Sequence, residues 1–400
     1  MSNKTEEART KPTAKPALVP KLRFPEFTGP WEKQELGSYL KEHTERVLAD
    51  TELPVYSSTR SGIKPQKDYF DGRELLNNGE YGVVPNGYFV YRHMSDDGTF
   101  KFNINNTGER IAVSKEYPIF RTMGLHPYFL LCKLNEGSDF ARFALIQKKG
   151  GTRTRLYFNT LCSWKTLLPT YSEQQKIADC LSSIDELITL ETQKIDMLKA
   201  HKKGLMQQLF PAEGETLPRL RFPEFRDAGE WEIGNLESMC DSISSGKDKS
   251  DSDGKFILYG STGVIGKTSS DTYNGEFLLA ARVGANAGLL KKVKGRFGVT
   301  DNTLVIRVNK KASIDFVFYS LINFCLSKLV FGSGQPLITG AQLKSLSFKI
   351  PHYQEQQKIA DCLFSVDELI ALENQKLDAL KAHKKGLMQQ LFPVSGEVRK

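Results

Sequence analysis

The stretch that decides the fold is YSEQQKIADCLSSIDELITLETQKIDMLKAHKKGLMQQLFP, which runs from Tyr171 to Pro211. It occurs again, with few changes, from Tyr353 to Pro393 as YQEQQKIADCLFSVDELIALENQKLDALKAHKKGLMQQLFP. Apolar residues in both copies follow the alternating spacing of three and four that is typical of a coiled-coil helix. A helix with such an apolar seam needs a partner, and the chain contains a second copy of it. We therefore predict two long helices that pair antiparallel with each other.

The predicted contacts between the helices are the apolar residues of this seam in each copy. They are Ile177, Leu181, Ile184, Ile188 and Leu198 in the first helix, and Ile359, Leu363, Val366, Ile370 and Leu380 in the second. At the start of the first helix, Ser172 is followed three residues later by Gln175, which predicts a capping box with Ser172 as the cap.

A second repeated segment precedes each of two variable regions. PKLRFPEF begins at Pro20 and PRLRFPEF begins at Pro218, and a tryptophan follows each box, at Trp31 and Trp231. The regions between box and helix contain short β-like runs and helical candidates such as 315–330. The order box, variable region, helix thus occurs twice. We predict an α+β protein in which two mixed α/β domains are joined by the two helices, with a pseudo-two-fold internal repeat.

The predicted domain boundaries follow from these repeats. They are a tail over 1–17, a first domain over 18–170, a helix over 171–211, a second domain over 212–352, a second helix over 353–393 and a tail over 394–400. The first tail is rich in Lys, Thr and Pro, a composition that predicts disorder.

The overall composition favours a cytoplasmic protein with a polyanionic partner. The 400 residues carry a formal net charge of +8, which favours such a partner without proving one. The six cysteines are scattered and form no CxxC pair, so we expect reduced thiols and no metal site. No apolar run is long enough to span a bilayer. We predict a cytoplasmic protein that does not contact a membrane.

The repeated motifs resemble those of the specificity subunit of type I restriction–modification systems. The resemblance covers residues 18–400 and is carried by the paired LRFPEF boxes with their tryptophan, the paired EQQKIADCL helices and the segment GSGQPLITGAQLKSLSFKIP. It implies two target-recognition domains, each reading half of a bipartite site in double-stranded DNA, held apart by the paired helices. It also implies two modification (methyltransferase) subunits as partners, which two restriction (translocase and nuclease) subunits can join.

The same resemblance implies that this chain has no active site and binds no cofactor. S-adenosylmethionine would be bound by the modification subunits, and ATP with magnesium by the restriction subunits. The residues agree, since no Pro-Pro pair occurs for the (N/D)PP(Y/F) loop of an adenine methyltransferase and no GxGxxG is present. The segment STGVIGKT at 261–268 is similar to a P-loop but lacks its first glycine. We predict no catalytic residue and no metal ligand.

Contacts to DNA are expected from polar and basic side chains near Gly-rich turns in the variable regions. Arg can bridge guanine O6 and N7, Gln can bridge adenine N6 and N7, and Lys mostly neutralises phosphates. The candidates are Lys64, Arg92, Arg153, Arg155, Lys267, Arg282, Arg296, Ser333 and Gln335.

Two alternatives remain open on the sequence alone. The chain could be a coiled-coil scaffold whose globular domains bind proteins, or a stand-alone enzyme that modifies DNA. DNA affinity that falls steeply as salt rises distinguishes a DNA reader from a scaffold. Methyl transfer by the purified chain with S-adenosylmethionine alone would indicate the enzyme.

Overall fold

The computed structural model describes residues 19–70, 79–148, 153–331 and 336–393. By its internal contacts the chain divides into two units. The first unit runs to Leu190 and resumes at Leu377, and the second unit comprises Glu191–Lys376. Each unit therefore contains one variable region and a part of both long helices. The tails predicted over 1–17 and 394–400 lie outside the described residues.

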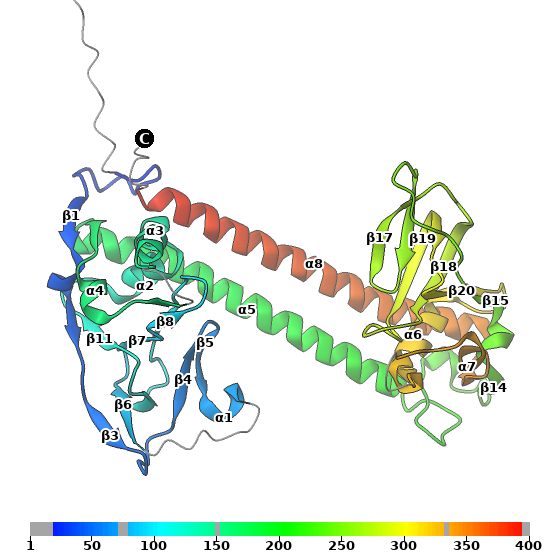
Figure 1. Cartoon of the computed structure of the whole chain (residues 1–400). Helices are drawn as coiled ribbons and strands as arrows, with labels where there is room; N and C mark the ends of the chain where they lie inside the picture. Colours follow the sequence, from blue (N-terminus) through cyan, green and yellow to red (C-terminus); the bar gives the residue numbers. More distant parts are fainter. Residues whose placement is uncertain (1–18, 71–78, 149–152, 332–335, 394–400) are drawn as a thin grey trace, which may run out of the picture. The chain divides into compact units, whose positions relative to one another are not determined.

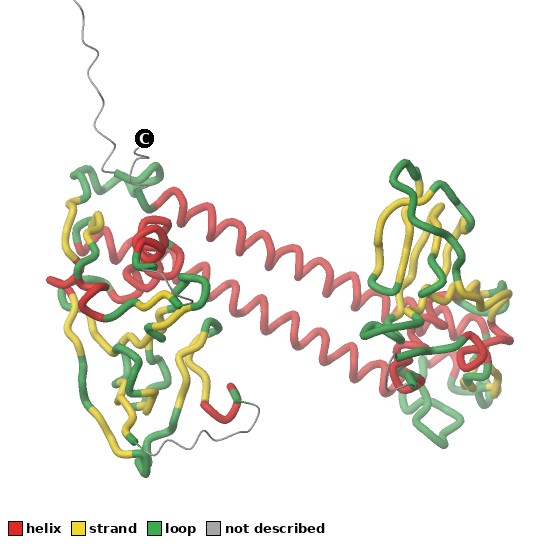
Figure 2. Tube along the Cα trace, viewed as in Figure 1, coloured by secondary structure: helices red, strands yellow, loops and turns green. Residues whose placement is uncertain are grey.

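The two repeated stretches form helices α5 (Tyr171–Leu209) and α8 (Tyr353–Leu391), each of 39 residues. Both helices are continuous along their length (Figure 2). They stop just before Pro211 and Pro393, as expected because proline cannot donate the next helical hydrogen bond. The predicted fold class, α+β with two long helices and an internal repeat, is confirmed.

The start of α5 differs from the prediction. Thr170 caps the helix, because its Oγ1 accepts a hydrogen bond from the amide of Glu173 at 3.5 Å. Tyr171 already belongs to the helix, so Ser172 lies within the first turn and is not the cap that the sequence predicted.

The two helices pair antiparallel within each unit. In the first unit Ile177, near the start of α5, shares a core with Leu391, near the end of α8. In the second unit Leu209, near the end of α5, shares a core with Ile359, near the start of α8. Of the predicted seam residues, Ile177, Leu181, Ile184, Ile359 and Leu363 are buried, and Ile188, Leu198, Val366, Ile370 and Leu380 are partly buried.

The variable region of the first unit is built from short antiparallel strand pairs. Its strands are β1 (Glu32–Glu35), β2 (Leu40–Glu42), β3 (Arg46–Leu48), β4 (Tyr56–Thr59), β5 (Gly62–Pro65), β6 (Glu80–Val84), β7 (Phe89–Tyr91), β8 (Met94–Ser95), β9 (Phe102–Ile104), β10 (Ile111–Ser114), β11 (Ile119–Thr122), β12 (Thr154–Arg155) and β13 (Lys165–Leu168). They form sheets in the orders β2-β11-β7-β9 and β10-β6-β3, with two-stranded pairs β1-β13, β4-β5 and β12-β8. The helices are α1 (Gln66–Tyr69), α2 (Pro127–Glu136), α3 (Ser138–Ile146) and α4 (Phe158–Cys162), with a 3-10 turn η1 (Leu36–Tyr39).

Strand β7 shows why this region has two cores. Successive side chains of a strand point to opposite faces. Phe89 and Tyr91 therefore face a large aromatic core that includes Phe129 of α2. Val90 between them faces a smaller core with Ile111. Every residue of β7 is buried, so the strand lies between two packed layers.

The variable region of the second unit is built around one six-stranded sheet. Its strands are β14 (Glu232–Asn235), β15 (Cys240–Ser245), β16 (Phe256–Gly260), β17 (Gly263–Thr268), β18 (Tyr273–Ala281), β19 (Leu290–Val299), β20 (Thr303–Val308) and β21 (Ser347–Ile350). The sheet has the order β15-β20-β18-β19-β16-β17, in which β16 and β19 are parallel, and β14 pairs with β21. The helices are α6 (Ile314–Phe324) and α7 (Gly340–Lys344), with 3-10 turns η2 (Pro223–Phe225), η3 (Leu236–Met239) and η4 (Leu326–Leu329).

The two faces of this sheet are covered differently. Leu278 and Ile306 pack against Val317 of α6, the helix expected from the apolar residues over 315–330. Phe277 and Phe297 belong to a separate cluster on the opposite face. The long strands β17, β18 and β19 extend beyond α6 (Figure 1).

The P-loop-like segment at 261–268 belongs to the hairpin of β16 and β17. The chain turns at Ser261 and Thr262 and continues directly into β17. A P-loop requires a helix after its glycine-rich turn. This segment therefore lacks the architecture of a nucleotide-phosphate loop.

In the first unit the LRFPEF box is bound to the start of α5. Arg23 donates two hydrogen bonds to the carboxylate of Glu173, at 2.7 and 2.8 Å, and the Trp31 indole donates a third at 3.1 Å. The next residue, Gln174, accepts a hydrogen bond from the amide of His126, the cap of α2, at 2.9 Å. The EQQ motif thus connects the box and the variable region to the helix.

The second unit repeats these contacts. Arg221 donates two hydrogen bonds to Glu355, both at 2.8 Å, and the Trp231 indole donates a third at 3.3 Å. Gln356 accepts from the amide of Ser313, the cap of α6, at 2.9 Å. The two motifs recognised as repeats in the sequence therefore meet in space, and they do so in the same way in both units.

A tyrosine hydroxyl attaches each variable region to an ion pair between the helices. In the first unit Lys384 of α8 lies 2.8 Å from Asp185 of α5, and Tyr128 of α2 donates a hydrogen bond to the same carboxylate. Burial, together with the neighbouring Cys132 and Asp185, raises the pKa of Tyr128 well above its ordinary value. The hydroxyl therefore keeps its proton and remains a donor.

The second unit has the corresponding contact at the same positions of the repeat. Lys202 of α5 pairs with Asp367 of α8 at 2.6 Å, and Tyr319 of α6 donates to Asp367 at 2.8 Å. The Lys202 amino group also lies 5.0 Å from the centre of the Tyr319 ring. In each unit a tyrosine of the variable region thus contacts the carboxylate of the ion pair between the helices, and in the second unit its ring also lies beside the lysine.

Candidate nucleic-acid interface

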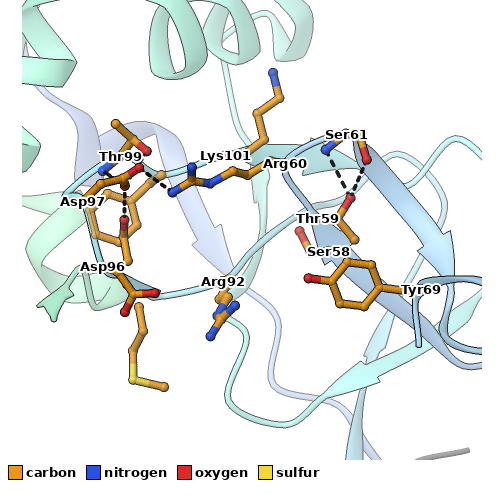
Figure 3. Close-up of a pocket in the computed structure, with 13 residues that line it drawn as sticks. Ser58, Thr59, Arg60, Ser61, Tyr69, Arg92, Asp96, Asp97, Thr99 and Lys101 are labelled. Atoms are coloured by element: carbon orange, nitrogen blue, oxygen red, sulfur yellow. Dashed lines mark hydrogen bonds and ion pairs between the residues drawn. The ribbon is translucent and has the colours of Figure 1, made fainter. Parts of the chain in front are cut away.

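A polar cavity of about 650 Å³ opens in the variable region of the first unit. It lies between the β4–β5 hairpin, helix α1 and the segment from β7 to β9 (Figure 3). Arg60, Arg92 and Lys101 line it together with Asp96 and Asp97. Grooves that carry basic side chains beside polar loops are typical of surfaces that bind nucleic acid.

One wall of this cavity is held by the carboxylate of Asp97. It accepts hydrogen bonds from the hydroxyl and amide of Thr99 at 2.7 and 3.0 Å, from Ser95 at 2.8 Å and from Arg60 at 2.7 Å. These bonds, led by those from Thr99, hold the pKa of Asp97 well below its ordinary value. Gly98 at the tip has a φ of +80°, a conformation that favours glycine.

Arg92 lines the cavity and is exposed (Figure 3). It directly follows β7, where alternation turns Tyr91 and His93 inward and leaves Arg92 facing outward. Within the part of the chain that the structure describes, Arg92 has no hydrogen bond and no ion pair. Its guanidinium is therefore available to a ligand.

The strand pair β8–β12 brings two further candidates to the same place. Met94 pairs with Arg155, so Arg155 lies across from a residue that lines the cavity. Arg153 precedes β12 and donates a hydrogen bond to Asp96 at 2.9 Å. Arg92, Arg153 and Arg155 come from segments about sixty residues apart in the sequence, and the fold gathers them around one cavity.

Lys64 lies on the neighbouring hairpin. It is exposed on β5 and pairs in register with Ser57 of β4, the residue before cavity-lining Ser58. The structure thus places Arg92 in the wall of this cavity and Arg153 and Arg155 beside it, whereas Lys64 lies on the hairpin without lining the cavity.

The candidates of the second unit are not gathered in this way. Lys267 pairs with Ile257, which in turn pairs with Phe297 of the aromatic face. Arg296, adjacent to Phe297, points to the opposite face, where its guanidinium lies 4.8 Å from the centre of the Phe256 ring. Lys267 and Arg296 therefore lie on different faces of the sheet.

Arg282 occupies a third position, at the end of β18. It is partly buried and donates a long hydrogen bond of 3.5 Å to the carbonyl of Asp301. Its Nε is buried and has no hydrogen-bond partner among the described residues. The remaining candidates, Ser333 and Gln335, lie outside the described residues.

Several residues of the first cavity were not among the sequence candidates. Asp96, Asp97 and Thr99 lack the basic or amide groups by which most of the candidates were predicted to contact DNA. The run Ser-Asp-Asp-Gly-Thr at 95–99 is a signal for a turn in which Asp accepts local hydrogen bonds. Tyr69 and Lys101 carry no comparable local signal.

Two classes of feature are missing from the described ranges. Residues 19–70, 79–148, 153–331 and 336–393 contain no group of three or more His, Cys, Asp or Glu side chains arranged to hold a metal ion. Over the same ranges, none of the helices has the length and apolar character required to cross a bilayer.

Comparison with known proteins agrees with the family resemblance of the repeated motifs. The family model of the type I restriction modification DNA specificity domain matches residues 86–200 and 228–382. The MjaVIII specificity subunit of a type I restriction enzyme from Methanocaldococcus jannaschii is 27% identical over 441 residues, covering 94% of each protein. The EcoprrI specificity subunit from Escherichia coli is 31% identical over 114 residues, 28% of each protein.

Solved structures resemble the fold as well. The S subunit of a type I restriction-modification system from M. genitalium gives a TM-score of 0.61 at 14% identity, covering 94% of this chain and 100% of that chain. A chain from a study of complex assembly and conformational transition of the type I R-M system gives a TM-score of 0.54 at 15% identity. The match covers 90% of this chain and 97% of that chain. At these identities the likeness concerns the fold.

Proposed function

Because the chain belongs to the type I restriction modification DNA specificity family, we propose that it is a non-catalytic subunit that selects a bipartite site in double-stranded DNA. Each variable region would read one half of the site. The chemistry would be performed by partner subunits, two for modification and two for restriction. S-adenosylmethionine would be bound by the former, and ATP with magnesium by the latter.

The observation that carries this proposal is the repetition of the attachment around different variable regions. Glu173 and Glu355 make the same three hydrogen bonds, while the regions that they hold have different sheets. A duplicated protein that needed one specificity would have no reason to keep two such different domains on one frame. Two domains that read different sequences explain the pattern.

The helices offer a repeated surface for the modification subunits. Leu187 and Leu190 of α5 are 51% and 54% exposed in the first unit. Leu369 and Leu372 of α8, at the corresponding positions of the repeat, are 39% and 60% exposed in the second unit. Residues three apart lie on one side of a helix, so each pair forms a small apolar patch. Two equivalent patches would accept two copies of one partner.

Selection from a randomised library of double-stranded DNA tests the proposal. The full-length protein is incubated with the library, and the bound fraction is sequenced. We expect a split motif, with two short specified halves around an unspecified gap. We also expect affinity to fall steeply with salt, because phosphate contacts release counterions. A contiguous motif, or no enrichment at all, would contradict the proposal.

A further inference from the structure

Arg60 and Arg92 line the cavity of the first unit, whereas Arg153 and Arg155 lie beside it, and the arginines differ in what they bind. Arg60 is paired with Asp97 at 2.7 Å, and Arg153 is paired with Asp96 at 2.9 Å. Arg92 has no such partner among the described residues. A guanidinium that already binds a carboxylate has fewer of its five N–H donors left for another acceptor. The planar guanidinium of Arg92 therefore keeps all five of its N–H donors for a ligand.

The surroundings of Arg92 are fixed before any ligand arrives. Asp97 ties the hairpin residue Arg60 to the loop that carries Ser95 and Thr99. The carboxylate is thus satisfied from two separate segments of the chain. Because this wall of the cavity is already ordered, less conformational entropy is lost when a ligand binds. A side chain beside an ordered wall can therefore discriminate between ligands.

The charges around Arg92 favour a base over a phosphate. Asp96 and Asp97 both line the cavity beside Arg92, and carboxylates repel phosphate oxygens. The edge of a base is uncharged and is not repelled. Guanine presents two acceptors, O6 and N7, whose spacing matches the guanidinium fork. Tyr69 adds an exposed aromatic ring to the same cavity (Figure 3).

We propose that Arg92 is a specificity-determining residue that reads a guanine, through O6 and N7 in the major groove, within the half-site bound by the first unit. This inference rests on the proposed function. Lys101 would have a different role, contact with a DNA phosphate, because its amino group points away from Arg92 (Figure 3).

The test compares three full-length variants with the wild-type protein. Arg92→Gln removes the fork that fits guanine, and Arg92→Lys keeps the charge but not the fork. Arg142→Gln is the control, because Arg142 is also exposed but lies on α3, where it donates to the carbonyl of Ser138 at 3.3 Å. Each protein selects sites from the randomised duplex library. Affinities are then measured at one salt concentration for the selected duplex and for the same duplex with one guanine replaced.

The wild type and the Arg142→Gln variant should select the same motif, with a specified guanine in one half. Arg92→Gln should lose the preference for that guanine, about 5- to 150-fold in relative affinity, and Arg92→Lys should lose part of it. The other half of the motif should be unchanged, which also shows that the variants are folded.

Two outcomes would count against the proposals, and they are distinguishable. If Arg92→Gln selects the same bases as the wild type at every position, the role of Arg92 is refuted while the proposed function stands. If the wild type itself selects no split motif, the proposed function fails, and the role of Arg92 fails with it.

Discussion

The two variable regions are attached to the helices in the same way, yet they are built differently. The first consists of short strands in several small sheets, and the second of one six-stranded sheet with strands of up to ten residues. They share the box, the EQQ motif, one tyrosine that reaches a carboxylate on the helices, and the strand pairs β1-β13 and β14-β21 with the 3-10 turns η1 and η3. The difference teaches that the elements beside the helices are kept in both units, while the rest of each domain is free to diverge.

The basic residues follow the same contrast. In the first unit Arg92 and Arg155 surround one cavity, whereas in the second unit Lys267 and Arg296 lie on opposite faces of a sheet. The basic residues proposed to contact DNA are therefore arranged differently in the two units. This is the behaviour expected of two readers that recognise different sequences.

The largest expected effect comes from removing the shared carboxylate. Glu355→Ala leaves the Trp231 indole without its acceptor, and it leaves Arg221, whose side chain is 8% exposed, with the carbonyl of Gly229 but no carboxylate. Breaking a buried ion pair in this way typically costs about 3–5 kcal/mol. Glu173→Ala should cost somewhat less, because Arg23 is 16% exposed and can reach water.

Hydrogen exchange followed by mass spectrometry measures both changes, because it reports on each unit separately. Glu355→Ala should increase exchange in the second unit and leave the variable region of the first unit unchanged. Glu368→Ala, an exposed position on α8, is the matched control. Equal loss of protection in both units would contradict the independence of the two attachments.

A smaller loss is expected from the tyrosine contacts. Tyr319→Phe removes the hydrogen bond to Asp367 but keeps the ring beside Lys202. Bonds to charged groups contribute about 1.5–3 kcal/mol, and we expect the lower end because Lys202 still pairs with the carboxylate. Tyr128→Phe should have a similar effect in the first unit. Urea unfolding curves of the two variants provide the measurement, and no change in either would refute the role of the hydroxyl.

The apolar patches on the helices should affect assembly without affecting folding. Leu190→Ser and Leu372→Ser should each weaken binding of one modification subunit by more than about 1 kcal/mol, roughly fivefold, as expected for a contact at the centre of an interface. Sedimentation with the cognate methyltransferase subunit should show one bound copy for each single variant under conditions where the wild type binds two. Two bound copies with unchanged affinity would exclude these leucines from the interface.

The smallest expected effects are those of single lysines that contact phosphates. Lys101→Ala in the first unit and Lys267→Ala in the second should each lower the slope of log affinity against log salt by about 1. Neither should alter the selected motif, because phosphate contacts carry no sequence information. A changed base preference in either variant would show that the lysine contacts a base.

Because the sequence contains an internal repeat, the long helices could be predicted from it. The 182-residue spacing identified α5 and α8, and the clustered apolar residues after Asp315 identified α6. The cap was misassigned because Ser172 and Thr170 are both good caps, and only the backbone decides between them.

The cavity was less accessible to prediction. Arg92 could be proposed from its residue type and its position after a β-like run. Its importance depends on Arg60 being paired with Asp97, across 37 residues of sequence. Such a pairing depends on the packing of separate strands, which one sequence without a repeat of that region cannot reveal. The DNA contacts of both units remain predictions.

The division of the chain into units has a consequence for synthesis. The second unit is one continuous segment, whereas the first also needs residues that follow the second unit in the chain. Phe392, whose ring lies 6.2 Å from that of Trp31, emerges from the ribosome after the whole second unit. Nascent chains usually fold from the N-terminus onward. Here the core around Trp31 can be completed only after the second unit has been made.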